Sequence, residues 1–94
     1  MNGQTSDQFN FEKDLNAALD EVRAMLVEKN RAYGDSALNP IRVFSKADPV
    51  EQLNVRMDDK LSRLVRGDSA GEDAERDLVG YLILKRIAER RVAG

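Results

Sequence analysis

Apolar residues recur at steps of three and four in the first third of the chain. They are Phe11, Leu15, Leu19, Val22, Met25 and Leu26. This spacing places them on one face of an amphipathic helix. The pattern predicts a first helix from Asn10, a residue type that caps helices, to about Ala32, with Gly34 in the left-handed position that ends many helices. Residues 1–9 are interpreted as a flexible leader to a single domain over residues 10–94.

A second helix is predicted to begin at Asp48. Asp48 can cap it, Pro49 suits its first position, and Glu51 completes a capping-box pattern. The helix is expected to end near Arg66 and Gly67, and its apolar stripe is Val50, Leu53, Met57, Leu61 and Leu64. The long connection over residues 33–48 contains an apolar anchor at residues 41–44. It is either a binding element or a packed crossover that covers the core.

The third predicted helix carries the most apolar run of the chain. Residues 72–84 read EDAERDLVGYLIL, and residues 78–84 are apolar on every side of a helix, as expected when several neighbours bury it. Ser69 and Glu72 are spaced as its capping box, and it should end near Arg91. The pattern predicts an all-α fold, with a three-helix protomer that assembles into a helical-bundle homo-oligomer, a dimer or larger. Oligomerisation would compensate for the small core of so short a chain.

The composition excludes several function classes. Fifteen Lys and Arg against seventeen Asp and Glu give a net charge of −2, which does not favour bulk nucleic-acid binding or an anionic membrane. The absence of cysteine and histidine excludes thiol nucleophiles, thiolate metal sites, Ser-His-Asp triads, a histidine general base and histidine-ligated zinc. Any metal site would be oxygen-rich and favour magnesium or manganese. With no apolar run of bilayer length, a cytoplasmic protein is expected.

Two groups of residues form a candidate phosphate site. Arg56, Lys60 and Arg63 fall on one edge of the stripe of the second helix, where guanidinium and ammonium groups can clamp a phosphate. Lys29 and Tyr33, at the end of the first helix, can add a phosphate contact and a stacking contact. The alternative is a solvated helix face crossed by salt bridges.

Carboxylates form a second candidate site. Asp73 and Asp77 lie one helical turn apart and, with Asp59 from the second helix, could hold magnesium against a pyrophosphate. Alternatively, Asp59 neutralises neighbouring arginines, and acidic residues in a first turn complement the helix dipole. Gly80 inside the helix indicates close approach of another helix or of a ligand, and Tyr81 is either a core aromatic or a stacking platform.

Three short motifs in order resemble a known family. They read Lys29-x-x-x-Tyr33-Gly34-Asp35-Ser36, then Asp59-Lys60-x-x-Arg63-Leu64, then Asp73-x-x-x-Asp77-Leu78-x-Gly80-Tyr81. The series resembles the nucleotide-modification-associated domain, type 1, found in small phage and prophage proteins and similar to MazG-like all-α nucleoside triphosphate pyrophosphohydrolases. The resemblance covers residues 28–84. It implies an all-α oligomer with a nucleotide ligand, in the cytoplasm of an infected bacterial host.

The acidic set is sparser than in MazG-like enzymes, which carry several glutamates for magnesium. Here arginine and lysine are interleaved with the carboxylates on the second helix. The first hypothesis is therefore a binder that captures a nucleotide, such as a cyclic signal of host immunity, without metal. The alternatives are a magnesium-dependent pyrophosphohydrolase, with Asp59, Asp73 and Asp77 as ligands, and a structural or adaptor helical protein.

Overall fold

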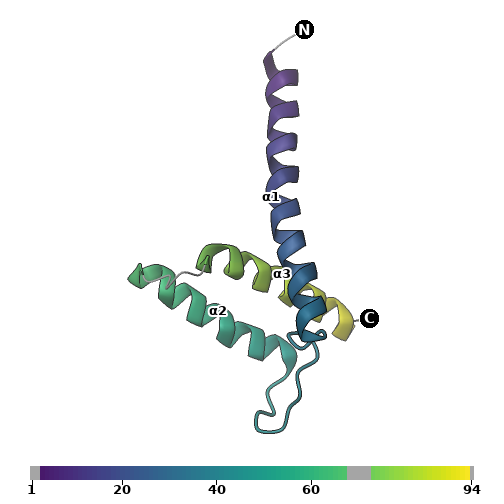
Figure 1. The fold of residues 1–94 in the computed structure, drawn as a ribbon, viewed down its shortest axis with the longest axis vertical. Coiled ribbons are helices and arrows are strands. Elements are labelled where there is room, and N and C mark those ends of the chain that lie inside the picture. Colours follow the sequence, from purple (N-terminus) through teal and green to yellow (C-terminus); the bar gives the residue numbers. More distant parts are fainter. Residues whose placement is uncertain (1–2, 68–72, 94) are drawn as a thin grey trace.

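The computed structural model describes residues 3–67 and 73–93. Within these ranges the chain forms three helices and no strand: α1 (Gly3–Tyr33), α2 (Pro49–Arg66) and α3 (Ala74–Ala93). Figure 1 shows α2 and α3 side by side as an antiparallel hairpin, while the C-terminal part of α1 crosses α3 and the rest extends away. The predicted all-α, three-helix protomer is confirmed.

The ends of α2 follow the sequence signals. The Asp48 carboxylate accepts a hydrogen bond from the Glu51 backbone N–H at 2.8 Å, and Pro49 is the first helical residue. At the other end Gly67 adopts a left-handed conformation with φ of 71°, and its N–H donates to the Leu64 carbonyl. Both predicted boundaries are confirmed, since the groups that satisfy the helix ends, the Asp48 carboxylate and the Gly67 backbone N–H, are local in sequence.

The start of α3 is set by Asp73. Its carboxylate accepts a hydrogen bond from the Arg76 backbone N–H at 2.9 Å, as a capping residue does, and the helix begins at Ala74. The predicted capping box at Ser69 and Glu72 lies outside the described residues. The helix ends at Ala93, two residues beyond the predicted Arg91.

The predicted start of the first helix was wrong. Helix α1 begins at Gly3, so Asn10 lies inside it and caps nothing, and most of the predicted leader is helical. The segment contains no proline to stop the helix, and the Gln8 side-chain amide donates to Glu12 one turn later at 3.3 Å. At the other end Gly34 has a φ of 63°, as predicted.

The core lies between α2, α3 and the connection that precedes α2. Leu53 is fully buried and packs with Leu38 and Ala88. Residues 37–38 therefore give the connection the role of a packed crossover. The predicted anchor further along was wrong, because Phe44 is 98% exposed. The chain turns outward after Leu38, and Arg42 donates to the Lys46 carbonyl at 2.7 Å, which closes the loop upon itself.

The apolar stripes are only partly covered within one protomer. In α2, Leu53 and Met57 are buried, but Leu61 and Leu64 are largely exposed. Among residues 8–33 of α1, only Met25 is buried, and every residue from 8 to 21 is exposed. Val79 and Leu82 of α3 are also exposed, so the all-round apolar run is not fully enclosed. The homo-oligomer stays a prediction.

No helix in the described parts of the chain combines the length and the apolar content that crossing a bilayer requires.

Candidate anion-binding pocket

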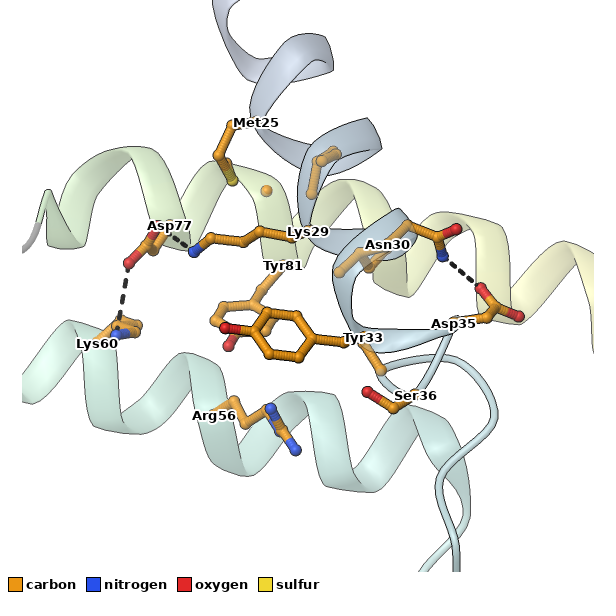
Figure 2. Close-up of a pocket in the computed structure, with 14 residues that line it drawn as sticks. Met25, Lys29, Asn30, Tyr33, Asp35, Ser36, Arg56, Lys60, Asp77 and Tyr81 are labelled. Carbon is orange, nitrogen blue, oxygen red and sulfur yellow. Dashed lines mark hydrogen bonds and ion pairs between the residues drawn. The ribbon is translucent and has the colours of Figure 1, made fainter.

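A pocket of about 360 Å³ lies where the C-terminal end of α1 faces α2 and α3 (Figure 2). This volume is within the range of small-molecule sites. The pocket is lined by Met25, Leu26, Lys29, Asn30, Tyr33, Asp35, Ser36, Ala37, Arg56, Lys60, Asp77, Gly80, Tyr81 and Leu84. Of the residues predicted for a phosphate site, Lys29, Tyr33, Arg56 and Lys60 therefore come together, from two helices separated by the long connection.

Gly80 allows α1 to approach the backbone of α3. A Cβ atom at this position would lie 2.9 Å from Met25 Cε and 3.2 Å from Leu26 Cδ2, closer than side chains normally pack. Of the two explanations for a glycine inside this helix, close approach of another helix is therefore the one observed. The contact holds the C-terminal part of α1 beside the pocket.

Asp77 is the central carboxylate of the pocket. Its Oδ1 lies 3.3 Å from Lys29 Nζ, and its Oδ2 lies 3.5 Å from Lys60 Nζ, so one carboxylate bridges α1 and α2. The Asp77 and Lys60 side chains are 10% and 12% exposed, whereas the Lys29 side chain is 52% exposed. Asp77 is the one buried polar residue in the described ranges, and two cations compensate its charge.

Arg56 adds a third cation to the lining. Its guanidinium has no hydrogen bond or ion pair with any residue in the part of the chain that the structure describes. The lining thus contains three cations, while its two carboxylates are Asp77 and Asp35, and Asp35 is paired with Arg91 at 3.0 Å. Among the described residues that line the pocket, cations therefore outnumber carboxylates by three to two, on a protein whose net charge is −2.

Asp35 fixes the turn that follows α1. It adopts a left-handed conformation with φ of 65° and accepts hydrogen bonds from Asn30 Nδ2 at 2.7 Å and Arg91 Nη1 at 3.0 Å. These bonds lower the pKa of the Asp35 carboxyl from its ordinary value of 3.8, and the bond from Arg91 has the larger effect. Sequence reasoning missed this role. The available signal was an aspartate directly after Gly34, since aspartate tolerates the left-handed region.

The two tyrosines occupy different positions in the pocket. The Tyr33 ring lies at the rim and is 69% exposed. Tyr81 is half-buried and packs against the core formed by Leu38, Leu53 and Ala88, so its interpretation as a core aromatic is confirmed although it also lines the pocket. Figure 2 shows both rings between the Lys29–Asp77 pair and Arg56.

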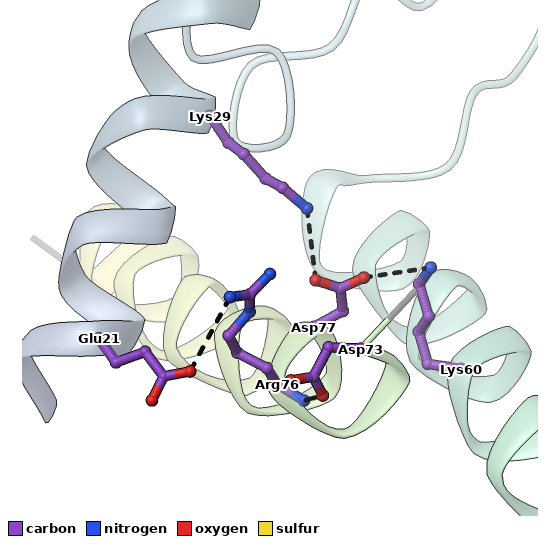
Figure 3. A network of polar contacts seen from close by, with 6 residues as sticks. All are labelled: Glu21, Lys29, Lys60, Asp73, Arg76 and Asp77. Atoms are coloured by element: carbon purple, nitrogen blue, oxygen red, sulfur yellow. Dashed lines mark hydrogen bonds and ion pairs between the residues drawn. The ribbon is translucent and has the colours of Figure 1, made fainter. Parts of the chain in front are cut away.

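The remaining predicted site residues lie outside the lining. Arg63 pairs with Asp59 one helical turn earlier at 3.2 Å, as in the alternative of a salt-bridged helix face. Asp73 caps α3, and Figure 3 shows it with Asp77, which turns toward the two lysines. Asp59, Asp73 and Asp77 thus have three separate roles, and no group of three carboxylates placed to hold a metal ion occurs in residues 3–67 and 73–93.

Comparisons with family models, curated proteins and solved structures give no match for this chain.

Proposed function

We propose that the pocket binds the phosphate group of a nucleotide. The observation that carries this proposal is the Arg56 guanidinium, which has no partner among residues 3–67 and 73–93 and lines the same pocket as Lys29 and Lys60. A guanidinium can donate two parallel hydrogen bonds to phosphate oxygens, and an ammonium group adds a compact charge. Lys29 and Lys60 share the Asp77 carboxylate, which holds both ammonium groups at the pocket.

Aromatic surface at the rim supports a nucleotide rather than free phosphate. Tyr33 presents an exposed ring beside the cations, and Tyr81 offers part of a second ring. Stacking of a nucleobase on an aromatic side chain contributes about 1–3 kcal/mol and tolerates different bases. The phosphate therefore contacts Arg56 and Lys29, and the base or sugar contacts Tyr33.

The positions of the carboxylates favour capture of an intact nucleotide over its hydrolysis. Asp77 already bridges two lysines, and Asp59 and Asp73 do not line the pocket. A magnesium-assisted reaction needs oxygen ligands that converge on the ion. Together with the family resemblance, this favours a phage-type homo-oligomer that sequesters a nucleotide, including a cyclic nucleotide signal of host immunity.

The test is incubation with a panel of linear and cyclic nucleotides, with and without magnesium. The bound fraction and the products are identified by mass spectrometry. Arg56→Met is expected to weaken binding by about tenfold or more, since a hydrogen bond to a charged group contributes about 1.5–3 kcal/mol. Arg63→Met is the matched control, because Arg63 lies on the same helix but outside the lining. It should bind as the unaltered protein does.

Each alternative has its own result. Recovery of the ligand intact and independently of magnesium supports capture. Pyrophosphate release that requires magnesium and is lost in Asp77→Asn identifies the pyrophosphohydrolase. If no nucleotide is retained or raises the melting temperature, the proposal is wrong and a structural or adaptor role remains.

A further inference from the structure

The N-terminal part of α1 has an apolar stripe that the described residues of the protomer leave exposed. Phe11, Leu15 and Leu19 are 59%, 42% and 52% exposed. The stripe continues through Val22 into Leu26, which is partly buried where α1 meets Gly80 of α3. Figure 1 shows this part of α1 extending beyond the α2–α3 hairpin. The exposed stripe is therefore the continuation of an internal packing surface.

The protomer exposes more surface than a compact protein of its mass. Its accessible surface is 7396 Å², whereas a compact monomer of 10.6 kDa exposes about 5,500 Å². Its radius of gyration is 16.7 Å, against about 12 Å for a compact domain of this length. The surface in excess is larger than the roughly 800 Å² that one partner buries in a standard interface. A second copy of similar shape can cover it.

The charges along α1 set the direction of pairing. Residues 7–21 contain five carboxylates and one lysine, whereas residues 22–33 contain three cations and one carboxylate. Parallel pairing would bring the two acidic segments together. Antiparallel pairing places the acidic segment of each copy beside the basic segment of the other, and opposite charges flanking an apolar seam favour that orientation.

We propose that α1 pairs antiparallel with α1 of a second copy through the stripe formed by Phe11, Leu15, Leu19 and Val22. The two-fold axis passes between Ala18 and Leu19, so that Phe11 of one copy lies opposite Leu26 of the other. Large apolar positions are symmetric about this point, since Phe11 and Leu26, and also Leu15 and Val22, lie at equal distances from it. The interface does not depend on which ligand the pocket takes.

The absence of native cysteine gives a direct test by disulfide formation. Cysteines must come within about 7 Å between Cα atoms to be bridged. Ala18→Cys, near the axis, is expected to form a disulfide-linked dimer by itself. Phe11→Cys should not do so alone, but should link to Leu26→Cys chains in mixtures, and Leu15→Cys should likewise link to Val22→Cys. Asp20→Cys, on the opposite face of the helix, is the matched control and should not link.

Two further measurements complete the test. Light scattering of the full chain should give twice the protomer mass or an even multiple of it. Leu15→Glu should lower that mass, whereas Asn16→Glu should leave it unchanged, with helix content checked by circular dichroism.

Three results would overturn the proposal. They are a monomeric mass for the unaltered chain, linking of Phe11→Cys to itself as efficient as that of Ala18→Cys, and linking of the stripe positions no stronger than that of Asp20→Cys. If Leu15→Glu fails to fold, the pattern of disulfide linking among the cysteine variants still tests the antiparallel pairing.

Discussion

The two parts of α1 belong to one helix and carry one apolar stripe, but their surroundings are opposite. Near its C-terminal end, Met25 is buried against Gly80, and Lys29 pairs with Asp77 at 3.3 Å. Near its N-terminal end, Phe11 and Leu15 face solvent in the protomer. The difference shows that periodicity reports which face of a helix is apolar, whereas a partner must exist before that face is buried.

The largest expected difference is in the cost of truncating an apolar side chain, which should be much greater in the core than in the exposed part of α1. Leu53→Ala should lower the free energy of unfolding by about 3 kcal/mol, because Leu53 is fully buried and its truncation leaves a cavity. Leu19→Ala should cost less than about 0.5 kcal/mol in a dilute monomer. Urea unfolding at several protein concentrations measures both.

Concentration dependence then sharpens this comparison. If α1 pairs with a second copy, the cost of Leu19→Ala grows as the protein concentration rises, because association stabilises only the folded chain. The cost of Leu53→Ala should stay close to its dilute value. Equal costs for the two variants at low concentration would contradict the assigned difference in packing.

The second prediction tests the crossing of α1 and α3. Gly80→Leu should destabilise the protein by about 1–3 kcal/mol, because the new side chain would occupy the space of Met25 and Leu26. Gly80→Ala should cost much less. The Met25 Cε atom is the end of a flexible chain, and alanine favours the helix by about 1 kcal/mol. Chemical denaturation measures both variants.

A matched control for the crossing is Val79→Leu, since Val79 is 41% exposed and adjoins Gly80 in sequence. It should leave the unfolding free energy nearly unchanged. Gly80→Leu should also weaken the proposed nucleotide binding, because it moves Lys29 away from Asp77. Full stability of Gly80→Leu would mean that α1 does not contact α3 as described.

The third prediction concerns the unequal burial of the two lysines. Lys60→Met should cost about 1–3 kcal/mol, since it removes a partner from a buried charged group and Lys60 itself is 12% exposed. Lys29→Met should cost about 1 kcal/mol or less, because that lysine is 52% exposed and its pair with Asp77 is screened by solvent. The measurement is urea unfolding in low salt. A larger cost for Lys29→Met than for Lys60→Met would contradict the conclusion that Lys60 is the more buried partner of Asp77.

Features of the fold that depend on neighbouring residues could be predicted from the sequence, whereas those that depend on distant contacts could not. The caps of α2 at Asp48 and Gly67 were predictable, because each depends on residues within one turn. The start of α1 was not, since residues 3–9 contain no stop signal and their helical state depends on continuation from the next turn. The exposed loop around Phe44 was also missed. An apolar residue predicts burial only where a partner surface is within reach.

In the pocket, residue types were predictable but their pairings were not. The cations Lys29, Arg56 and Lys60 were identified from spacing and resemblance, and they do line one pocket. That Asp77 bridges two of them depends on how α1 crosses α3, a contact between residues 48 positions apart in sequence. Arg63 has the spacing of a ligand residue but pairs with Asp59 on the helix surface. Helical spacing alone does not distinguish a charged residue that lines the pocket, such as Lys60, from one that forms a salt bridge on the helix surface, such as Arg63.

The smallest expected effect concerns the turn at the packed end of α1 and depends on pH. The hydrogen bond from Arg91 is the main cause of the lowered pKa of Asp35, so the carboxylate stabilises the fold at pH values above its unfolded pKa and loses this contribution as pH falls through the folded pKa. Arg91→Ala should therefore cost at most about 1 kcal/mol near neutral pH, as an exposed pair does. The cost should shrink below about pH 4, where Asp35 becomes protonated in the variant and then in the unaltered protein. Arg90→Ala is the control and should show no such pH dependence, while a cost for Arg91→Ala that persists at pH 2 would assign its effect to packing rather than to the Asp35 carboxylate.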